Sequence, residues 1–167
     1  MIEHIFPAPH HITVGYLGQP GQRTFIIQIE DDEQRLSLVA EKGQIEGLGE
    51  LLAQVLAQID QTPATDWDRE AMALREPVEP AWRVGEIGVG MDPQGRVLIE
   101  LSALVPEDTD PDVARISIDH DQARRLAAHA QQIVGEGRPV CQLCGRPTDP
   151  DGSHVCPATN GHGVLSR

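Results

Sequence analysis

The stretch Val14-Gly-Tyr-Leu-Gly18 decides the fold expected for this chain, because its pattern returns at Val84-Gly-Glu-Ile-Gly88. An apolar run rich in β-branched residues follows each copy, at residues 23–29 in the first half and at residues 96–101 in the second. Such runs, set off by glycine and proline turns, are typical of β-hairpins. Each half of the chain therefore begins with two predicted strands.

A third predicted strand in each half opens with a shared pattern, Arg35-Leu-Ser-Leu38 in the first half and Arg115-Ile-Ser-Ile118 in the second. After each of them, apolar residues recur at steps of three and four, which indicates a helix with one apolar face. The order strand, strand, strand, helix is thus predicted twice.

The two predicted helices differ in how they start. In the first, at about residues 44–59, Gly47 and Gly49 either permit close packing or indicate a later start, since glycine weakens a helix by about 1 kcal/mol relative to alanine. The second runs over about residues 119–134. Its first residue, an aspartate, and Gln122 resemble a capping box.

Agreement in residue types, order and offset predicts an internal duplication, with β-β-β-α units at about residues 12–60 and 82–134. Three strands and one helix cannot bury both faces of a sheet, so the units should combine. We expect an α+β domain over residues 1–137, in which one mainly antiparallel sheet of about six strands carries two packed helices.

Two stretches are expected to lie outside these units. Residues 61–80 are acidic and proline-rich, which indicates a linker with at most a short helix near residues 66–74. Residues 1–11 indicate a lead-in broken by prolines, in which His10 and His11 are expected to be exposed. The repeated glycines are expected to let a strand bend or another backbone approach, since they do not lead into a helix as a phosphate-binding loop would.

The tail at residues 138–167 holds all three cysteines of the chain, in Cys141-Gln-Leu-Cys144-Gly145 and His154-Val-Cys156. A Cys-x-x-Cys knuckle aims two thiolates at one point, and the histidine and third cysteine can complete a tetrahedron. Three sulfur ligands and one nitrogen select Zn²⁺ over hard cations. The sequence predicts a structural zinc site formed by Cys141, Cys144, His154 and Cys156.

Other interpretations of the tail stay open. His162 could replace His154 as the fourth ligand, although the short Asp149-Pro150-Asp151-Gly152 turn favours His154. The cysteines could instead form a disulfide with one thiol left over, or lie buried as thiols. Because the tail has few large apolar residues, we expect it to fold only with metal.

Composition limits the partners. A formal charge of −13 and a pI near 4.8 oppose binding to phosphate backbones, and 3% aromatic residues leave few platforms for base stacking. No apolar run approaches the roughly 18 residues of a membrane span. With thiolates kept for metal, a cytoplasmic protein with a protein partner and no membrane contact is expected.

Two further function classes were weighed against an interaction role. A nucleic-acid-binding protein would need Arg23, Arg35, Arg96 and Arg115, which hold matching strand positions, to form one exposed positive face. A hydrolase would need a nucleophile beside a base, but Ser37 and Ser117 lie within predicted strands. His120 and His129 lie nine residues apart on one predicted helix, so they face opposite sides. No common catalytic motif is present.

Three segments together resemble a known family: residues 14–25 (VGYLGQPGQRTF), Trp82-Arg83-Val84-Gly85, and the tail from Cys141 to Gly161. The chain resembles, along nearly its whole length, a bacterial family best known from actinobacteria, domain-of-unknown-function family 3090. The resemblance implies His154 as the fourth zinc ligand, because the family pattern usually has an aromatic residue where His162 stands. Members are described near a histidine-phosphatase-like and a lipid-kinase-like protein, which implies an accessory of such a pathway, or a hydrolase, as an alternative.

Overall fold

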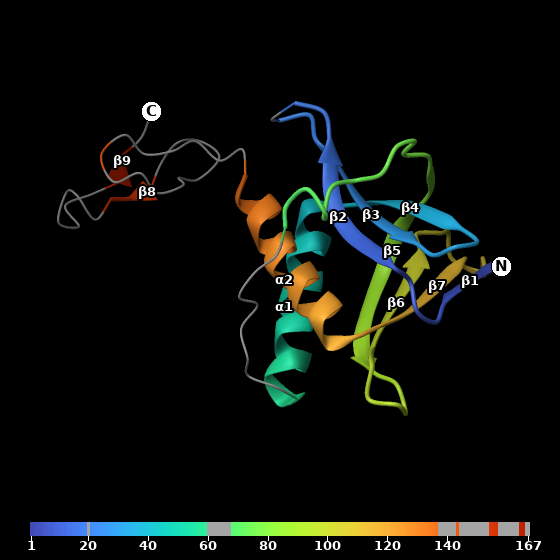
Figure 1. The fold of residues 1–167 in the computed structure, drawn as a ribbon. Coiled ribbons are helices and arrows are strands. Elements are labelled where there is room, and N and C mark those ends of the chain that lie inside the picture. Colours follow the sequence, from blue (N-terminus) through green and yellow to red (C-terminus); the bar gives the residue numbers. More distant parts are fainter. Residues whose placement is uncertain (20, 60–67, 137–142, 144–153, 157–163, 166–167) are drawn as a thin grey trace. The chain divides into compact units, whose positions relative to one another are not determined.

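The computed structural model describes residues 1–19, 21–59, 68–136, 143, 154–156 and 164–165. The chain divides into two compact units, Met1–Val134 and Gly135–Arg167, and each is described by itself. The first unit is a seven-stranded sheet with two helices side by side (Figure 1). The predicted α+β class is confirmed.

The sheet has the strand order β1-β7-β6-β5-β4-β3-β2. Neighbours pair antiparallel within β2-β3-β4 and within β5-β6-β7, whereas β4 with β5 and β1 with β7 pair parallel. Each antiparallel set is followed in the chain by a helix, so the element order of the two halves is the predicted one. The strands are β1 (Glu3–Phe6), β2 (His11–Leu17), β3 (Thr24–Glu30), β4 (Arg35–Ala40), β5 (Pro80–Met91), β6 (Val97–Ala103) and β7 (Val113–Ile118).

Strand β1 corrects the expectation that residues 1–11 are only a lead-in. It pairs in parallel with β7, from Glu3 opposite Val113 to Phe6 opposite Ile116, and Phe6 is fully buried. The prolines at positions 7 and 9 come after this strand and end it. The four-residue strand has no alternating pattern, and its partner lies far along the chain, so the local sequence gave no signal for it.

The sheet must curl strongly, because the strands at its two ends are consecutive in the chain. A flat seven-stranded sheet would separate its edges by about 29 Å, at about 4.8 Å per pair. The connection over residues 7–10 reaches only about 18 Å even when extended. A contact between the β3–β4 turn and β1 agrees with this closure, since Gln34 Nε2 donates to the Ile5 carbonyl at 3.1 Å.

Helix α1 (Lys42–Ile59) begins slightly before its predicted start and contains both glycines. Gly49 faces α2 (His120–Gly135), where a Cβ in its place would lie 3.3 Å from Cβ of Ala130, whereas a Cβ at Gly47 would meet no atom within 4 Å. Close packing therefore explains Gly49 but not Gly47. Neither helix in the described part of the chain is long and apolar enough to cross a bilayer.

The predicted capping box at the start of α2 is confirmed. The backbone nitrogen of Gln122 donates to Oδ1 of Asp119 at 2.8 Å. The backbone nitrogen of Asp119 donates to the side-chain Oε1 of Gln122 at 3.1 Å. These two bonds satisfy donors that a helix start would otherwise leave unpaired. The cap fixes where α2 begins relative to the sheet.

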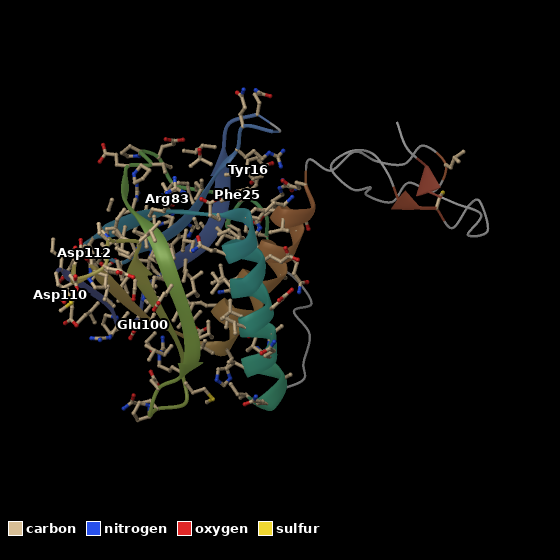
Figure 2. All side chains as sticks on the ribbon, turned by 180° about the vertical axis from the view of Figure 1, so that it is seen from behind. Tyr16, Phe25, Arg83, Glu100, Asp110 and Asp112 are labelled. Atoms are coloured by element: carbon tan, nitrogen blue, oxygen red, sulfur yellow. The ribbon has the colours of Figure 1, made fainter. Side chains whose placement is uncertain are left out.

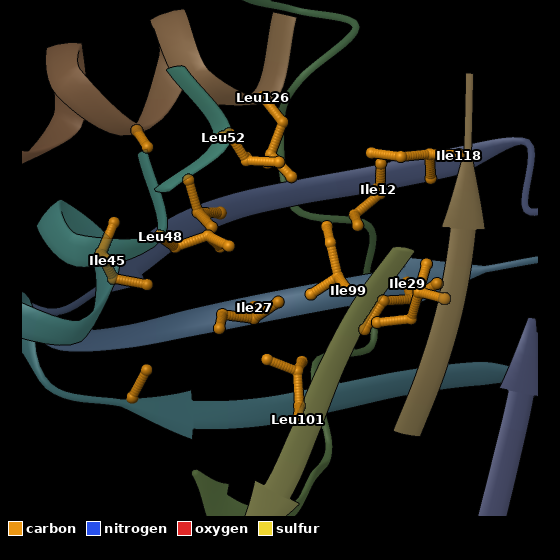
Figure 3. Close-up of a cluster of buried hydrophobic side chains, with 14 of the residues drawn as sticks. Ile12, Ile27, Ile29, Ile45, Leu48, Leu52, Ile99, Leu101, Ile118 and Leu126 are labelled. Atoms are coloured by element: carbon orange, nitrogen blue, oxygen red, sulfur yellow. The ribbon is translucent and has the colours of Figure 1, made fainter. Parts of the chain in front are cut away.

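The apolar faces of both helices and one face of the sheet form a single core (Figure 3). Successive strand residues alternate between this face and the opposite one. The core is built almost wholly of aliphatic side chains, as the low aromatic content requires. Residues labelled in Figure 3 include Ile27 and Ile29 of β3, Ile99 and Leu101 of β6, Leu48 and Leu52 of α1, and Leu126 of α2.

The repeated glycines do permit close approaches. A Cβ at Gly85 would lie 2.9 Å from the Cα of Leu104, the residue after β6, whose nitrogen donates to the Arg83 carbonyl at 2.7 Å where the β5–β6 pairing is irregular. At the matching position in β2, a Cβ at Gly15 would lie 2.7 Å from Cγ of Leu74. Gly85 thus permits a close backbone approach within the sheet, and Gly15 makes room for a side chain that packs on β2.

In the second unit, the described residues form a short antiparallel pair, β8 (His154–Val155) with β9 (Val164–Leu165). His154 lies opposite Leu165 in this pair. Cys156, directly after β8, is buried.

Candidate functional site

Two of the four predicted zinc ligands fall on residues that the structure does not describe. Cys141, Cys144 and the alternative ligand His162 lie outside the described residues. The backbone of His154 belongs to β8, and Cys156 is buried next to it. Among the described residues, no group of three or more His, Cys, Asp or Glu could hold a metal ion. The zinc site therefore stays a prediction.

The described part of the chain has a different polar site, on the face of β2, β3 and β4 that points away from the core. Thr13, Gln28 and Ser37 are cross-strand neighbours there and are all buried. We call these three residues the polar row. Gln28 Nε2 donates to Ser37 Oγ at 3.1 Å. Buried polar groups need such partners, because an unpaired one costs about 1 to 3 kcal/mol.

Residues 68–79, which we call the cover segment, supply the remaining partners. Thr13 Oγ1 donates to the Met72 carbonyl at 2.5 Å. Gln28 bonds both backbone groups of Arg75: its Nε2 donates to the carbonyl at 3.0 Å, and its Oε1 accepts from the amide at 2.7 Å. These residues were expected to belong to a linker, and their bonds show that they also form a layer on the sheet. Its described part forms turns around residues 69–72 rather than the suggested helix.

A charged row, His11, Glu30 and Arg35, lies next to the polar row in the same register. Arg35 Nε and Arg75 Nη1 both bind the Glu30 carboxylate, the latter at 2.5 Å. Arg35 also donates to the Glu76 carbonyl at 2.8 Å. Burial would raise the pKa of Glu30, but the bonds from Arg35 and Arg75 outweigh it and hold that pKa below its usual range. Glu30 thus ties the cover segment to the sheet.

His11 corrects the expectation of an exposed histidine pair. Its exposed fraction is 5%, whereas the His10 side chain stays 43% exposed. Burial, followed by the positive charge of Arg75, lowers the pKa of His11 to about 4. The ring has a hydrogen bond with the backbone of Ala73, and its Nε2 has no partner among the described residues. His11 is therefore neutral at pH 7.

A hollow of about 360 Å³ adjoins His11, between β2, the cover segment and the first turns of α2. We call it the β2 hollow. Gln122 fixes its edge, because its Nε2 donates to the Pro9 carbonyl at 2.8 Å and so holds the loop before His10. The polar residues that line it are His10, His11, Asp68, Arg75, Gln122 and Arg125.

Two of the four arginines predicted at matching strand positions are bound by carboxylates. Arg35 binds Glu30, and Arg115 binds both Glu3 at 2.7 Å and Glu100 at 3.0 Å. The other two lie just before β3 and β6, Arg23 over the ring of Tyr16 with its Cζ 3.9 Å from the centroid, and Arg96 with the Ser117 hydroxyl at 2.9 Å. The carboxylate pairing of Arg35 and Arg115 argues against one positive face on the sheet.

The serines and helix histidines considered as catalytic candidates have local partners in the structure. His120 Nε2 bonds the Gly95 carbonyl at 2.8 Å, and His129 Nε2 bonds the Val14 carbonyl at 2.9 Å. Ser117 donates to Asp92 at 2.9 Å, and Ser37 belongs to the polar row. These bonds tie turns and strands together, so the structure gives each residue a structural role.

One family is similar to this chain over nearly its whole length. The model of the family described as "Protein of unknown function (DUF3090)" matches residues 4–156. The chain, an α+β protein with a covered polar face, belongs to this family. No curated protein and no solved structure matches it.

Proposed function

We propose that the protein is a non-enzymatic zinc-binding interaction protein, in which the sheet unit presents a fixed acidic surface to a protein partner. The observation that carries this proposal is that Arg35 and Arg115 are bound by carboxylates of the sheet unit itself, in a chain of charge −13. A basic or neutral protein surface is the complementary partner.

Two acidic regions support such a surface. A hollow of about 460 Å³ beside the β3–β4 turn is lined mainly by carboxylates, among them Asp31, Asp32 and Glu79. Asp110, Asp112 and Glu100 lie on one side of the sheet unit in Figure 2. Acidic loops of this kind steer a basic partner and speed its encounter, an effect that salt weakens.

The tail supplies the second element of the proposal. Cys141, Cys144, His154 and Cys156 hold one structural Zn²⁺, which needs deprotonated thiolates and therefore a reducing compartment such as the cytoplasm. Structural zinc contributes about 10 to 16 kcal/mol in small finger peptides, enough to fold a tail with few apolar residues.

The shared element order also supports the proposal that the two halves arose by duplication. Both place a serine two residues after an arginine in their third strand, and both have a Val-Gly pair within their first strand, Val14-Gly15 and Val84-Gly85. Superposition of residues 12–60 on residues 82–134 in an experimental structure would test it. Different strand connections in the two halves would refute it.

Capture of partners from the native cell tests the interaction role. Tagged wild-type protein, purified with zinc retained, should hold a defined protein after nuclease treatment and release it at high salt. Recovery of nucleic acid alone, or loss of all bound material after nuclease, would favour the nucleic-acid alternative instead.

The zinc proposal has its own test, with a matched control in the same knuckle. Elemental analysis should give one Zn²⁺ per chain for the wild type and for Gln142→Ser, and none for Cys144→Ser. The main thermal transition should stay nearly in place in all three, because the sheet unit has its own core. A wild type without stoichiometric metal would contradict the proposal. Loss of the main thermal unfolding transition in Cys144→Ser would contradict it as well.

A further inference from the structure

Strand β1 leaves one edge of the sheet unpaired. It pairs only with β7, and no ladder joins it to β2 in the described part of the chain (Figure 1). The Val113 nitrogen donates to the Ile2 carbonyl at 2.9 Å, so every second residue from Ile2 onward turns its backbone groups toward β7. The N–H and C=O groups of Glu3 and Ile5 therefore point away from β7, to the free edge.

Of these outward groups, only the Ile5 carbonyl has a partner among the described residues. Gln34 Nε2 donates to it at 3.1 Å. The strand at the other end of the sheet, β2, is held by α2, where His129 Nε2 bonds the Val14 carbonyl at 2.9 Å. Since unpaired backbone groups in a row are a template for another strand, β1 is the end of the sheet that can accept one.

The side chains at this edge are exposed and mainly apolar. Ile5 is 54% exposed, and Ile2, just before the strand, is 59% exposed. Charged side chains commonly protect such an edge, but Arg115 binds the carboxylate of Glu3 at 2.7 Å. An extended segment beside β1 would gain main-chain bonds from Glu3 and Ile5 and apolar contact with Ile5. These are the two components of recognition by strand addition.

The hollow of about 460 Å³ beside the β3–β4 turn, which we call the acidic hollow, adjoins this edge. Gln34 lines it and also bonds the Ile5 carbonyl. Among its carboxylates, Glu30 is bound by Arg35 and Arg75. The carboxylates that line it without an arginine partner in the described part of the chain are Asp31, Asp32, Glu33 and Glu79. A lysine or arginine side chain there would meet several anions.

We propose that the free edge of β1 binds an extended segment of the partner protein, which adds to the sheet as a strand. The segment has apolar side chains against Ile5 and carries lysine or arginine at the end that passes Gln34, where these side chains enter the acidic hollow. This surface deepens the proposed interaction role and rests on it.

Two peptides that differ only in their backbone test the binding mode. Calorimetric titration of the full chain with Arg-Arg-Val-Thr-Val-Thr-Val-Arg-Arg should show saturable binding. The same peptide with N-methyl groups on each valine and threonine keeps its charge but cannot pair as a strand, so it should bind at least tenfold more weakly. No saturable binding of the first peptide, or equal affinities for the two, would overturn the proposal.

Hydrogen exchange gives a readout at the proposed atoms. Before titration, the amides of Glu3 and Ile5 should exchange faster than those of His4 and Phe6, which face β7. The unmethylated peptide should slow exchange at Glu3 and Ile5 selectively. Unchanged exchange at these two amides under saturating peptide would place the ligand elsewhere and overturn the assignment.

Ile5→Glu tests the edge, with Met91→Glu as its control. Both positions are exposed and apolar, but β6 and β7 separate Met91 from β1. Ile5→Glu should weaken binding of the unmethylated peptide at least tenfold, because it places a charge where an apolar side chain should pack, while Met91→Glu should leave it within twofold. Equal losses would contradict the proposed edge.

The double variant Asp32→Asn, Glu33→Gln tests the acidic hollow. Its control, Glu46→Gln with Glu50→Gln on α1, removes the same charge from exposed positions outside the hollow. The first should weaken binding of the unmethylated peptide at least fivefold and the second less than twofold. Equal effects would show a response to net charge alone, which contradicts the hollow as a binding site.

The partner captured from the native cell separates this surface from the interaction role. A protein that binds Ile5→Glu as tightly as the wild type would overturn the surface and leave the role in place, whereas capture of no protein by the wild type would overturn both. Sedimentation of the wild type as a dimer and of Ile5→Glu as a monomer would assign the edge to a second copy of this chain instead.

Discussion

The outer faces of the two halves of the sheet differ, although matched residues build them. Ser37 is buried under the cover segment and accepts from Gln28, whereas Ser117 is partly exposed and binds Arg96 and Asp92. Arg35 reaches backbone carbonyls of the cover segment as well as Glu30, while Arg115 binds only side chains, those of Glu3 and Glu100.

The difference shows that the cover segment changes how much the same Arg-x-Ser pattern contributes to stability in β4 and in β7. Exposed ion pairs such as those of Arg115 contribute little, because water screens the charges. Buried, mutually satisfied bonds such as those of Gln28 are costly to break, because removing one partner leaves the others unpaired. The covered face should therefore dominate the response of the protein to mutation and pH.

Gln28→Ala should have the largest effect, a loss of about 3 kcal/mol or more in the free energy of unfolding. The change removes the partners of both Arg75 backbone groups and of Ser37. Arg115→Ala, its control on the open face, should cost far less, because the ion pairs that it removes are exposed. Urea unfolding of both variants gives the comparison, and equal losses would show that the cover segment adds no stability.

The pH dependence of stability should also come from the covered face, through His11. Its pKa is about 4 when folded and near 6.5 when unfolded, so the unfolded state binds the proton more readily between these values. Stability is unaffected by this group above pH 6.5 and falls as pH drops toward 4, by up to about 3 kcal/mol. Unfolding of the wild type and of His11→Asn between pH 7 and pH 4 should show a shallower decline in the variant; parallel curves would contradict the assignment.

Gly15 and Gly85 hold matching positions in β2 and β5, so alanine substitutions there compare the two halves directly. Gly85→Ala should cost about 2 kcal/mol, because the added Cβ meets the backbone of Leu104, which cannot move alone. Gly15→Ala meets only the Leu74 side chain and should cost less, while raising hydrogen exchange in the cover segment. A larger loss at Gly15 than at Gly85 would reverse this ranking.

The smallest expected effect lies on α1. Gly47→Ala should stabilise the protein by up to about 1 kcal/mol, because the position is helical and a Cβ there meets open space. Gly49→Ala should gain less or lose stability, since its Cβ would lie 3.3 Å from Ala130. Melting temperatures of the two variants measure this difference. An equal gain in stability would mean that α1 and α2 move apart at Gly49 without cost.

Periodic patterns predicted most of the elements of the sheet unit. The runs at residues 35–40 and 44–59 and the capping box were visible because apolar spacing and cap chemistry are local signals. Strand β1 and the cover segment were missed, since both are held by distant partners. Thr13, Gln28 and Ser37 follow the pattern of a strand face that points to solvent, so the local sequence did not indicate that the outer face is covered.

The zinc site and the β2 hollow also differ in how far local sequence signals predict them. Cysteine spacing alone predicts the zinc ligands, because coordination chemistry restricts both residue type and separation. The β2 hollow joins residues from β2, the cover segment and α2, which no single stretch of sequence places together. His11 was visible only as half of a histidine pair, and its burial depends on packing from two other segments.

The parallel pairing of β1 with β7 has a consequence for folding during synthesis. Residues 3–6 leave the ribosome long before their partners at residues 113–116, so β1 has no strand to join until the residues between them have been made. Pairing across such a separation closes a long loop and is slow. The nascent first half therefore waits with the β1 edge unpaired, and a fragment that ends before residue 113 would keep that edge available to another molecule.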